Sequence, residues 1–218
     1  MSITLAAVSD SLSRHLPIYR VRAPVYQQVM LESLRAVWRS QDRRILDVGG
    51  GTGVIAQAIS DLFPIDSITS VDVEDRYLKT LSVETRTYDG RNLPFEGGAF
   101  DCVVINNVIH HVELDDRLAL IRECRRVAPN GVILIKDHLA ASWLDHVRLA
   151  VLDLIGNVPF HGMVKARYLT AADWSKLAAA AGYEIETSTS GRYRGGLFAL
   201  LFPNRLETTM RWHALSRS

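Results

Sequence analysis

The residues best suited to contact a ligand lie in one glycine-rich stretch, Asp47-Val-Gly-Gly-Gly-Thr-Gly53. This stretch follows a short apolar run at 44–48 and precedes a segment with helical spacing. Gly49, Gly51 and Gly53 permit positive φ angles and leave no Cβ to obstruct a ligand that lies against the main chain. We therefore expect a ligand to approach the backbone at this turn.

Two acidic residues follow at positions that fit an adenosine group. Asp72 lies at the end of the second apolar run, where a carboxylate can accept hydrogen bonds from both hydroxyls of a ribose. Asp89 comes just after the third run, at the height where an adenine amino group would lie. Together, the glycine turn and these two acids predict a site for an adenosine-containing ligand.

Two classes of ligand use such a site. Gly51-Thr-Gly-Val-Ile-Ala56 satisfies the dinucleotide pattern GxGxxG/A, so an NAD(P)-dependent oxidoreductase is one interpretation. Asp47 argues against it, because a carboxylate at this position would repel a pyrophosphate but could organise the loop around a cationic amino-acid group. The sequence also lacks the YxxxK pair of short-chain hydride chemistry. The oxidoreductase stays open as an alternative.

A second set of ionisable residues could remove a proton from a substrate. His110 and His111 follow the fourth apolar run, and Asp137 and His138 follow the fifth. A histidine titrates near pH 6.5, which suits a general base, although a histidine just beyond a strand can also satisfy a backbone carbonyl. Asp137 could instead bind a divalent ion, but the matching acids are not evident in the sequence, so we expect no metal.

Short apolar runs alternate with helical segments, which predicts a doubly wound α/β fold with a Rossmann-like, mostly parallel sheet. Strands are expected at 44–48, 68–73, 85–88, 101–106 and 132–136, and helices at about 54–62 and 114–128. A capping box at Thr170 and Asp173 predicts a later helix that stops at Gly182. Two further strands, at 183–189 and 196–202, are expected to form a C-terminal antiparallel hairpin through the glycine-bearing turn 191–196.

The 218 residues are expected to form a single domain. Residues 1–40 would be an N-terminal arm with a helix at about 24–38, and residues 41–137 would be the core. The insertion 138–170, with one helix and the loop 156–162, follows the fifth strand at the edge where α/β sheets bind ligands, so we interpret it as a lid. Residues 171–218 would supply the last helix and the hairpin. Aromatic residues of the lid and the arm could form a cavity for an apolar or aromatic small molecule, or they could simply pack in the core.

The composition is that of a globular protein, with 48% hydrophobic and 22% charged residues. The apolar runs are far shorter than the roughly 20 residues that a membrane-spanning helix needs. The N-terminus lacks the basic region of a secretory signal, so we expect a cytoplasmic protein with no membrane partner. The net charge of +1 hides basic ends and an acidic middle. Because the basic ends carry no stacking platform, we expect no nucleic-acid partner; a homo-oligomer stays open.

The stretch Ile45-Leu-Asp-Val-Gly-Gly-Gly-Thr-Gly53 resembles the first motif of the class I S-adenosylmethionine-dependent methyltransferases. The similarity continues in order through 71–72, 89–90, 93–104 and 106–111, and residues 22–26 are distantly similar to ubiquinone and menaquinone biosynthesis methyltransferases. The resemblance implies a cofactor site that comprises Asp47, Gly49, Gly51 and Gly53 around the methionine part, Asp72 at the ribose, Val73, Asp89 and Gly90 near the adenine, and Asn106 beside the sulfonium.

The resemblance implies S-adenosylmethionine as the cofactor and in-line transfer of a methyl group to a small-molecule acceptor. Such a protein need only align the acceptor and, for a weakly acidic atom, remove its proton. The chain departs from the family at Gly50, often Cys or Ala, and at Asn130, where a second glycine is usual; neither change is expected to abolish binding. The residues do not decide between oxygen, nitrogen and carbon acceptors, and a non-catalytic cofactor-binding module also stays open.

Overall fold

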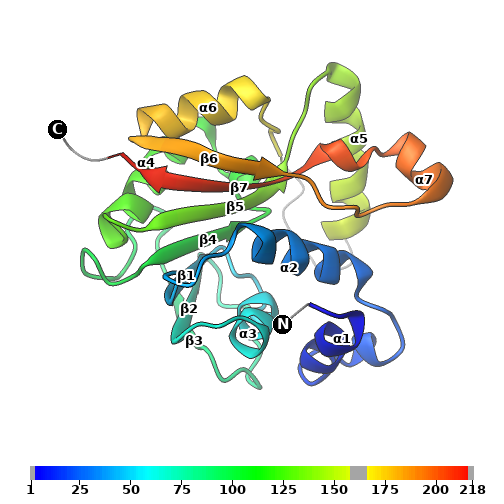
Figure 1. Ribbon diagram of the computed structural model, residues 1–218, viewed down its shortest axis with the longest axis horizontal. Helices are drawn as coiled ribbons and strands as arrows, with labels where there is room; N and C mark the ends of the chain where they lie inside the picture. The colour runs from blue at the N-terminus through cyan, green and yellow to red at the C-terminus, as the bar shows by residue number, and fades with distance from the viewer. Residues whose placement is uncertain (1–2, 158–165, 216–218) are drawn as a thin grey trace.

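The computed structural model, which describes residues 3–157 and 166–215, is organised around a seven-stranded sheet with the order β3-β2-β1-β4-β5-β7-β6 (Figure 1). The strands β1 to β5 pair in parallel, and β7 runs antiparallel to both of its neighbours. The predicted doubly wound, mostly parallel sheet with a reversed last strand is confirmed. The strands are β1 (Arg44–Val48), β2 (Ser67–Asp72), β3 (Glu84–Thr87), β4 (Cys102–Asn106), β5 (Val132–His138), β6 (Tyr183–Thr189) and β7 (Glu207–Ala214).

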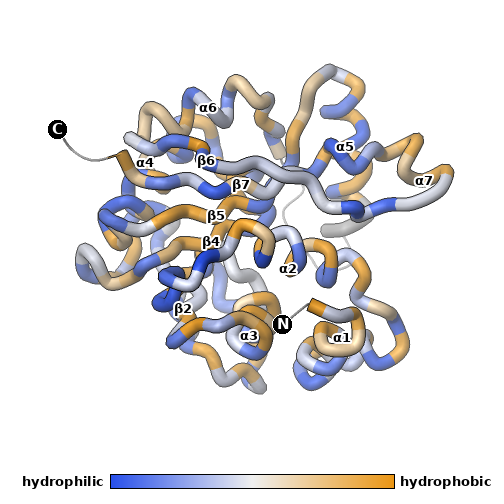
Figure 2. Tube along the Cα trace, viewed as in Figure 1, coloured by the Kyte–Doolittle hydropathy of each residue, from blue (hydrophilic) through white to orange (hydrophobic). Residues whose placement is uncertain are grey.

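Helices cover both faces of the sheet. On one face lie α1 (Leu5–Ser13), α2 (Val25–Val37) and α3 (Val54–Leu62), and on the other lie α4 (Leu114–Val127) and α6 (Ala171–Ala180). Successive side chains of β4 alternate between the two apolar layers: Val104 faces the first layer, whereas Val103 and Ile105 face the second. Because both faces are covered, β4 is apolar up to Asn106 and β5 is apolar over its first four residues, as Figure 2 shows.

The helix starts follow local capping signals. Helix α3 begins directly after Gly53, whose φ of 76° completes the glycine turn. Helix α6 begins with the predicted capping box between Thr170 and Asp173, and Gly182 follows its end with a φ of 77°. Helix α1 was not expected, although its N-cap Thr4 accepts a hydrogen bond from a backbone amide, as such residues commonly do.

The prediction of a strand at 196–202 is wrong. Residues Gly196–Leu201 form the short helix α7, and the last strand is β7, at Glu207–Ala214. A short apolar run without alternation does not distinguish a strand from a helix. The true strand was missed because it is polar: Arg211 is buried in it and pairs with Asp42 at 2.6 Å, which offsets the cost of burying the charge. Strands β6 and β7 are antiparallel neighbours, but α7 lies in the connection between them.

The expected insertion contains helix α5 (Trp143–Asn157), which reaches over the carboxyl end of β5. Asp145 at its start is buried and pairs with Arg205 at 2.7 Å. The side chain of Trp143, on the first turn of the helix, is 76% exposed. Most of the expected loop 156–162 lies outside the described residues, and the lid role of the insertion stays a prediction.

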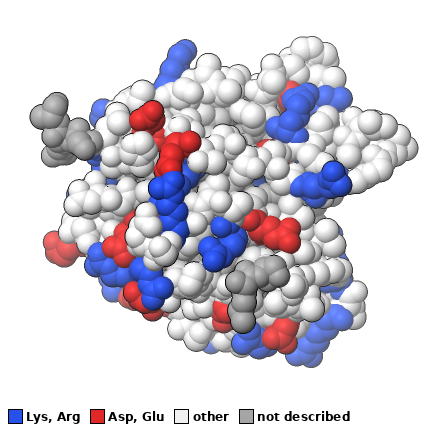
Figure 3. Space-filling view, viewed as in Figure 1, with Lys and Arg blue, Asp and Glu red and all other residues white. Residues whose placement is uncertain are grey.

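Charged side chains of both signs lie interspersed on the face of the molecule shown in Figure 3. Within the described part of the chain, every helix is too short or too polar to cross a bilayer.

Candidate functional site

The carboxyl ends of β1 and β4 determine where the candidate site lies. These strands are neighbours, and the chain leaves β1 toward β2 on one side but leaves β4 toward β5 on the other. Such a reversal of connection opens a crevice at the carboxyl edge of the sheet, where open α/β folds bind ligands. The glycine loop follows β1, and residues 106–111 follow β4. The predicted cofactor residues and the predicted bases therefore meet at one edge of the sheet.

The glycine loop turns tightly over the end of β2. The amides of Gly49 and Gly50 both donate to the carbonyl of Val71, at 2.7 and 3.1 Å. The amide of Gly51 donates to the Asp72 carboxylate at 2.7 Å. Gly51 has a φ of 58°, and a Cβ built on it would have no heavy atom within 4 Å. Its backbone is thus bare on the outer side, which fits direct contact between the loop and a ligand.

Asp47 lies beneath this loop and is only 2% exposed. Its carboxylate accepts a hydrogen bond from the Ser70 hydroxyl at 2.8 Å. Burial, helped by the charge of Asp72 and opposed by the hydrogen bond from Ser70, raises the pKa of Asp47 to about 6. A cationic ligand group beside this carboxylate would offset the cost of its burial, which supports the predicted role of Asp47 toward the amino-acid part of a cofactor.

We expect the Asp47→Asn variant to be more stable than the wild type near pH 7, by up to about 3 kcal/mol. A raised folded-state pKa means that the folded protein holds this proton more tightly than the unfolded chain. The resulting stabilisation is complete below the ordinary carboxyl pKa and is lost as the pH rises through about 6.

Urea unfolding of both proteins between pH 4 and pH 7 checks this prediction. The free energy of unfolding of the wild type should fall relative to that of Asp47→Asn across this window, and saturating S-adenosylhomocysteine should reduce the difference. If the difference in free energy of unfolding between the two proteins stays constant with pH, the burial of the Asp47 carboxylate does not destabilise the folded protein.

Asp72, at the end of β2, presents its carboxylate to the loop edge. One oxygen accepts from Gly51, and the other accepts from the amide of Glu74 at 3.1 Å; the Arg76 guanidinium lies 3.7 Å away. A carboxylate can accept about four hydrogen bonds, so the two bonds from the backbone fix its position and leave about two acceptor sites open. The remaining capacity fits the predicted contact with ribose hydroxyls.

Asp89 is exposed and holds the turn after β3. It accepts hydrogen bonds from the backbone and side-chain nitrogens of Asn92 and from the amide of Arg91, at 2.6 to 2.8 Å. These bonds lower the pKa of Asp89 to about 2. At Gly90, a Cβ would lie 3.3 Å from Val73, which is 52% exposed. The apolar side chain beside bare backbone suits a flat ring, and the assignment of Asp89, Gly90 and Val73 to adenine stays a prediction.

The side chain of Asn106, the last residue of β4, indicates whether the site suits a polar cofactor. Both polar atoms of its side-chain amide are buried, and no described residue hydrogen-bonds to them. Leaving such a group unsatisfied costs on the order of 1–3 kcal/mol, which a polar ligand in the crevice would relieve. Together with the bare backbone of Gly51 and the remaining capacity of Asp72, this amide fits an adenosyl amino acid such as S-adenosylmethionine.

Asp137, in β5, is fully buried and organises the segment after β4. Its carboxylate accepts from the amide of Ile109 at 3.0 Å and from that of His138 at 2.6 Å, and it lies 2.5 Å from Nδ1 of His110. Burial opposes its charge, but His110 and His138 outweigh that effect and hold the pKa of Asp137 at about 2. When the ring of His110 carries a single proton, on the Nδ1 that faces Asp137, its lone pair lies on Nε2.

His138 lies between two carboxylates that the sequence analysis did not identify. Its Nδ1 is 3.1 Å from Glu207, and its Nε2 is 3.3 Å from Asp153. Burial disfavours the charged ring, but these two acids outweigh it and raise the pKa of His138 to about 9. The sequence signal for Asp153 was an acid among the apolar residues of a helix, whereas Glu207 lay beyond the expected last strand. Neither acid was evident from the sequence, and the expectation of no metal stays a prediction.

Lys136 links the N-terminal arm to this site. Its Nζ is fully buried and donates to Glu207 and to Asn107, both at 2.7 Å, and to the hydroxyl of Tyr26 at 2.5 Å. Glu207 also pairs with Arg194. Tyr26, expected to line an apolar cavity or to pack in the core, thus contributes its hydroxyl to a buried ionic network that holds α2 against the sheet.

The structure brings together three of the four predicted catalytic residues, His110, His138 and Asp137, and buries all of them. His111 lies beside them, with its ring centroid 4.0 Å from that of His110, and it is half-buried. A histidine that accepts a proton from a substrate must be within reach of that substrate. By this criterion, His111 is more accessible than the other three.

The sheet order, the glycine turn and the acid after β2 together define the class I methyltransferase fold. A family described as "Methyltransferase domain" matches residues 22–188. The chain belongs to this methyltransferase family, which confirms the predicted relationship to the class I S-adenosylmethionine-dependent methyltransferases. S-adenosylmethionine is the cofactor that this family implies.

Two named relatives of the chain are O-methyltransferases. Strychnine O-methyltransferase of Strychnos nux-vomica is 28% identical over 68% of this chain and 43% of its own length. Malonyl-[acyl-carrier protein] O-methyltransferase of Geobacter sulfurreducens is 31% identical over 55% of this chain and 48% of its own length. The chain therefore spans less than half the length of these relatives. An S-adenosylmethionine-dependent methyltransferase from Mesorhizobium loti shares the fold, with a TM-score of 0.62, 14% identity and coverage of 85% and 97% of the two chains.

Proposed function

We propose that this chain transfers the methyl group of S-adenosylmethionine to an oxygen atom of a small-molecule acceptor. The observation that carries the proposal is that three groups lie at the same edge of the sheet: the bare backbone of Gly51 after β1, the carboxylate of Asp72 at the end of β2 and the unsatisfied amide of Asn106 at the end of β4. Oxygen is favoured over nitrogen and carbon because the two named relatives are O-methyltransferases.

The residues of this chain would bind and align the reactants. S-adenosylmethionine, when bound, supplies a methyl group that is already electrophilic. Asp72 would bind the ribose and Asp47 the cationic amino group, and Asn106 would hold the reacting end of the ligand. The half-buried ring of His111 would accept the proton of the acceptor hydroxyl, while Asp137 fixes the segment that carries it through the amide of Ile109.

The test of this function has two measurements. Calorimetry should show that S-adenosylhomocysteine binds the purified chain and that NADH and NADPH do not. Labelled S-adenosylmethionine, offered with a panel of phenols and other small hydroxyl compounds, should yield a product that carries one additional methyl group. Clean titration by a nicotinamide dinucleotide and not by S-adenosylhomocysteine would overturn the proposal in favour of the oxidoreductase. Cofactor binding without label transfer to any acceptor would indicate a non-catalytic module.

A further inference from the structure

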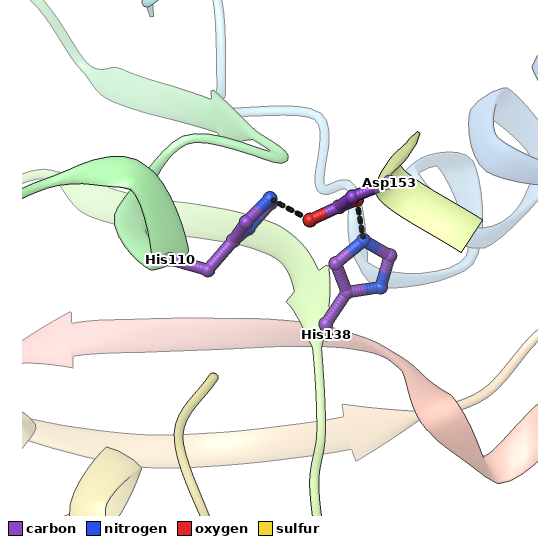
Figure 4. Close-up of side chains that lie close together, drawn as sticks. All are labelled: His110, His138 and Asp153. Carbon is purple, nitrogen blue, oxygen red and sulfur yellow. Dashed lines mark ion pairs between the residues drawn. The ribbon is translucent and has the colours of Figure 1, made fainter. Parts of the chain in front are cut away.

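A buried group of side chains beneath α5 has the composition of a metal site. His110 follows β4, His138 ends β5, and Asp153 projects from α5, so three separate elements converge at one point (Figure 4). One potential ligand atom from each residue lies within 4.8 Å of the others, and all three residues are at most 7% exposed.

Two of the distances between potential ligand atoms suit a small cation. Nε2 of His138 lies 3.3 Å from one Asp153 oxygen, and Nε2 of His110 lies 3.5 Å from the other. Two ligands that each lie about 2.1 Å from a tetrahedral ion are separated by about 3.4 Å. The His110 contact is also too long to be a good hydrogen bond, and Nε2 of His110 has no hydrogen-bond partner among the described residues.

Each histidine is backed by its own carboxylate. Nδ1 of His110 lies 2.5 Å from Asp137, and Nδ1 of His138 lies 3.1 Å from Glu207 as an ion-pair contact without hydrogen-bond geometry. This is the arrangement that orients metal-binding histidines, because a carboxylate that accepts the Nδ1 proton directs the Nε2 lone pair outward and increases its basicity. Both Nε2 atoms then point toward Asp153. Two imidazoles that each contact a carboxylate through Nδ1 and face Asp153 through Nε2 thus have the arrangement of metal ligands.

The charge around the cluster also favours a cation. Three buried carboxylates, those of Asp137, Asp153 and Glu207, surround the histidines. Lys136 and Arg194 both pair with Glu207, which leaves Asp137 and Asp153 with histidine partners. Buried charges require compensation, which the protonated ring of His138 supplies when no ion is bound and which a divalent ion would supply in its place.

We propose that His110, His138 and Asp153 bind a divalent transition-metal ion of the Zn²⁺ type, which fastens α5 to the sheet. Two imidazoles and one carboxylate favour zinc and its neighbours in the first transition row over Mg²⁺ and Ca²⁺, which prefer oxygen ligands. The ion would occupy the Nε2 lone pair of His110, which leaves His111 as the base of the proposed reaction. The proposed site goes beyond that reaction and does not depend on it.

Metal titration of the full chain tests the site without any activity assay. After treatment with a chelator, the wild type should bind one Zn²⁺ per chain at micromolar concentration with a rise in thermal midpoint. It should also bind Co²⁺ with the intense visible absorption of a tetrahedral site. Asp153→Asn and His138→Gln should each lose at least about 100-fold in affinity, and Asp137→Asn, behind His110, should lose about 10- to 100-fold.

The matched control is His146→Gln, which alters an exposed histidine on the same helix near Tyr168. This variant should bind both metals as the wild type does. Circular dichroism of each metal-free variant establishes that it is folded, and Asp137→Asn, which keeps all three ligands, provides the test if a ligand variant does not fold. The proposal is overturned if the wild type binds no stoichiometric metal, or if the three cluster variants bind it as tightly as His146→Gln.

Discussion

An Asp72→Ala variant is expected to bind S-adenosylhomocysteine about a thousandfold more weakly than the wild type. Hydrogen bonds to a charged carboxylate are worth about 1.5–3 kcal/mol each, so the loss of two to a ribose amounts to about 4 kcal/mol. The substitution also removes the acceptor of the Gly51 amide, which lies 2.7 Å from the carboxylate and fixes the loop. Isothermal calorimetry of the two proteins measures the difference directly.

Two further variants distinguish the loss of hydrogen bonds to the ligand from the loss of the contact that fixes the glycine loop. Asp72→Asn keeps the shape of the side chain and one acceptor oxygen, so its loss of affinity should be intermediate, about 10- to 100-fold. Glu74→Gln changes an exposed side chain on the same turn and should bind as the wild type does. If Asp72→Ala binds S-adenosylhomocysteine within threefold of the wild type, Asp72 has no part in cofactor binding.

The cofactor half of the site could be predicted because its parts are local in the sequence. The glycine turn directly follows β1, and Asp72 ends β2, so each feature is recognisable beside an apolar strand. The fold then brings the glycine turn and Asp72 close together, because parallel strands place their carboxyl ends at one edge of the sheet. The role of Asp89 was inferred from its place after the third apolar run and that of Asn106 by resemblance, and the structure adds the hydrogen-bonded turn of the first and the unsatisfied amide of the second.

The two acids that complete the histidine cluster, Asp153 and Glu207, could not be predicted. They are distant in the sequence from the histidines and belong to elements whose packing and pairing the sequence does not reveal. Asp153 meets His138 only when α5 folds over the sheet. Glu207 meets Lys136 and His138 only when β7 pairs antiparallel with β5, which places Glu207 opposite His138. Because β7 is polar, its apolar periodicity is weak, and the more apolar α7 was mistaken for the last strand. Buried ion pairs, which make a polar central strand tolerable, leave no periodic signal in the sequence.

A Gly50→Ala variant is expected to unfold with a free energy about 1–3 kcal/mol lower than that of the wild type, the usual cost of overpacking. Position 50 is one of the two positions at which the sequence differs from the family pattern that it resembles: it has glycine where cysteine or alanine is common. A Cβ there would overlap the Ser70 hydroxyl and lie 2.6 Å from the Asp47 carboxylate. The loop cannot easily move away, because the amide of Gly50 is bonded to Val71. The side chain of Ser70 thus fills the space that an alanine or cysteine at position 50 would need.

The double variant Gly50→Ala, Ser70→Gly tests this explanation. Ser70→Gly alone should also be destabilising, because it places glycine within a strand and removes the hydrogen bond that Asp47 accepts from the hydroxyl. In the double variant the new methyl group occupies the vacated space, so its loss of stability should be smaller than the sum of the two single losses by at least about 1 kcal/mol. Urea unfolding of the four proteins gives this coupling energy, and strictly additive losses would refute the explanation. S-adenosylhomocysteine should still bind the double variant, because the bare backbone at Gly51 is unchanged; the residue at position 50 is then determined by packing against β2 and not by the ligand.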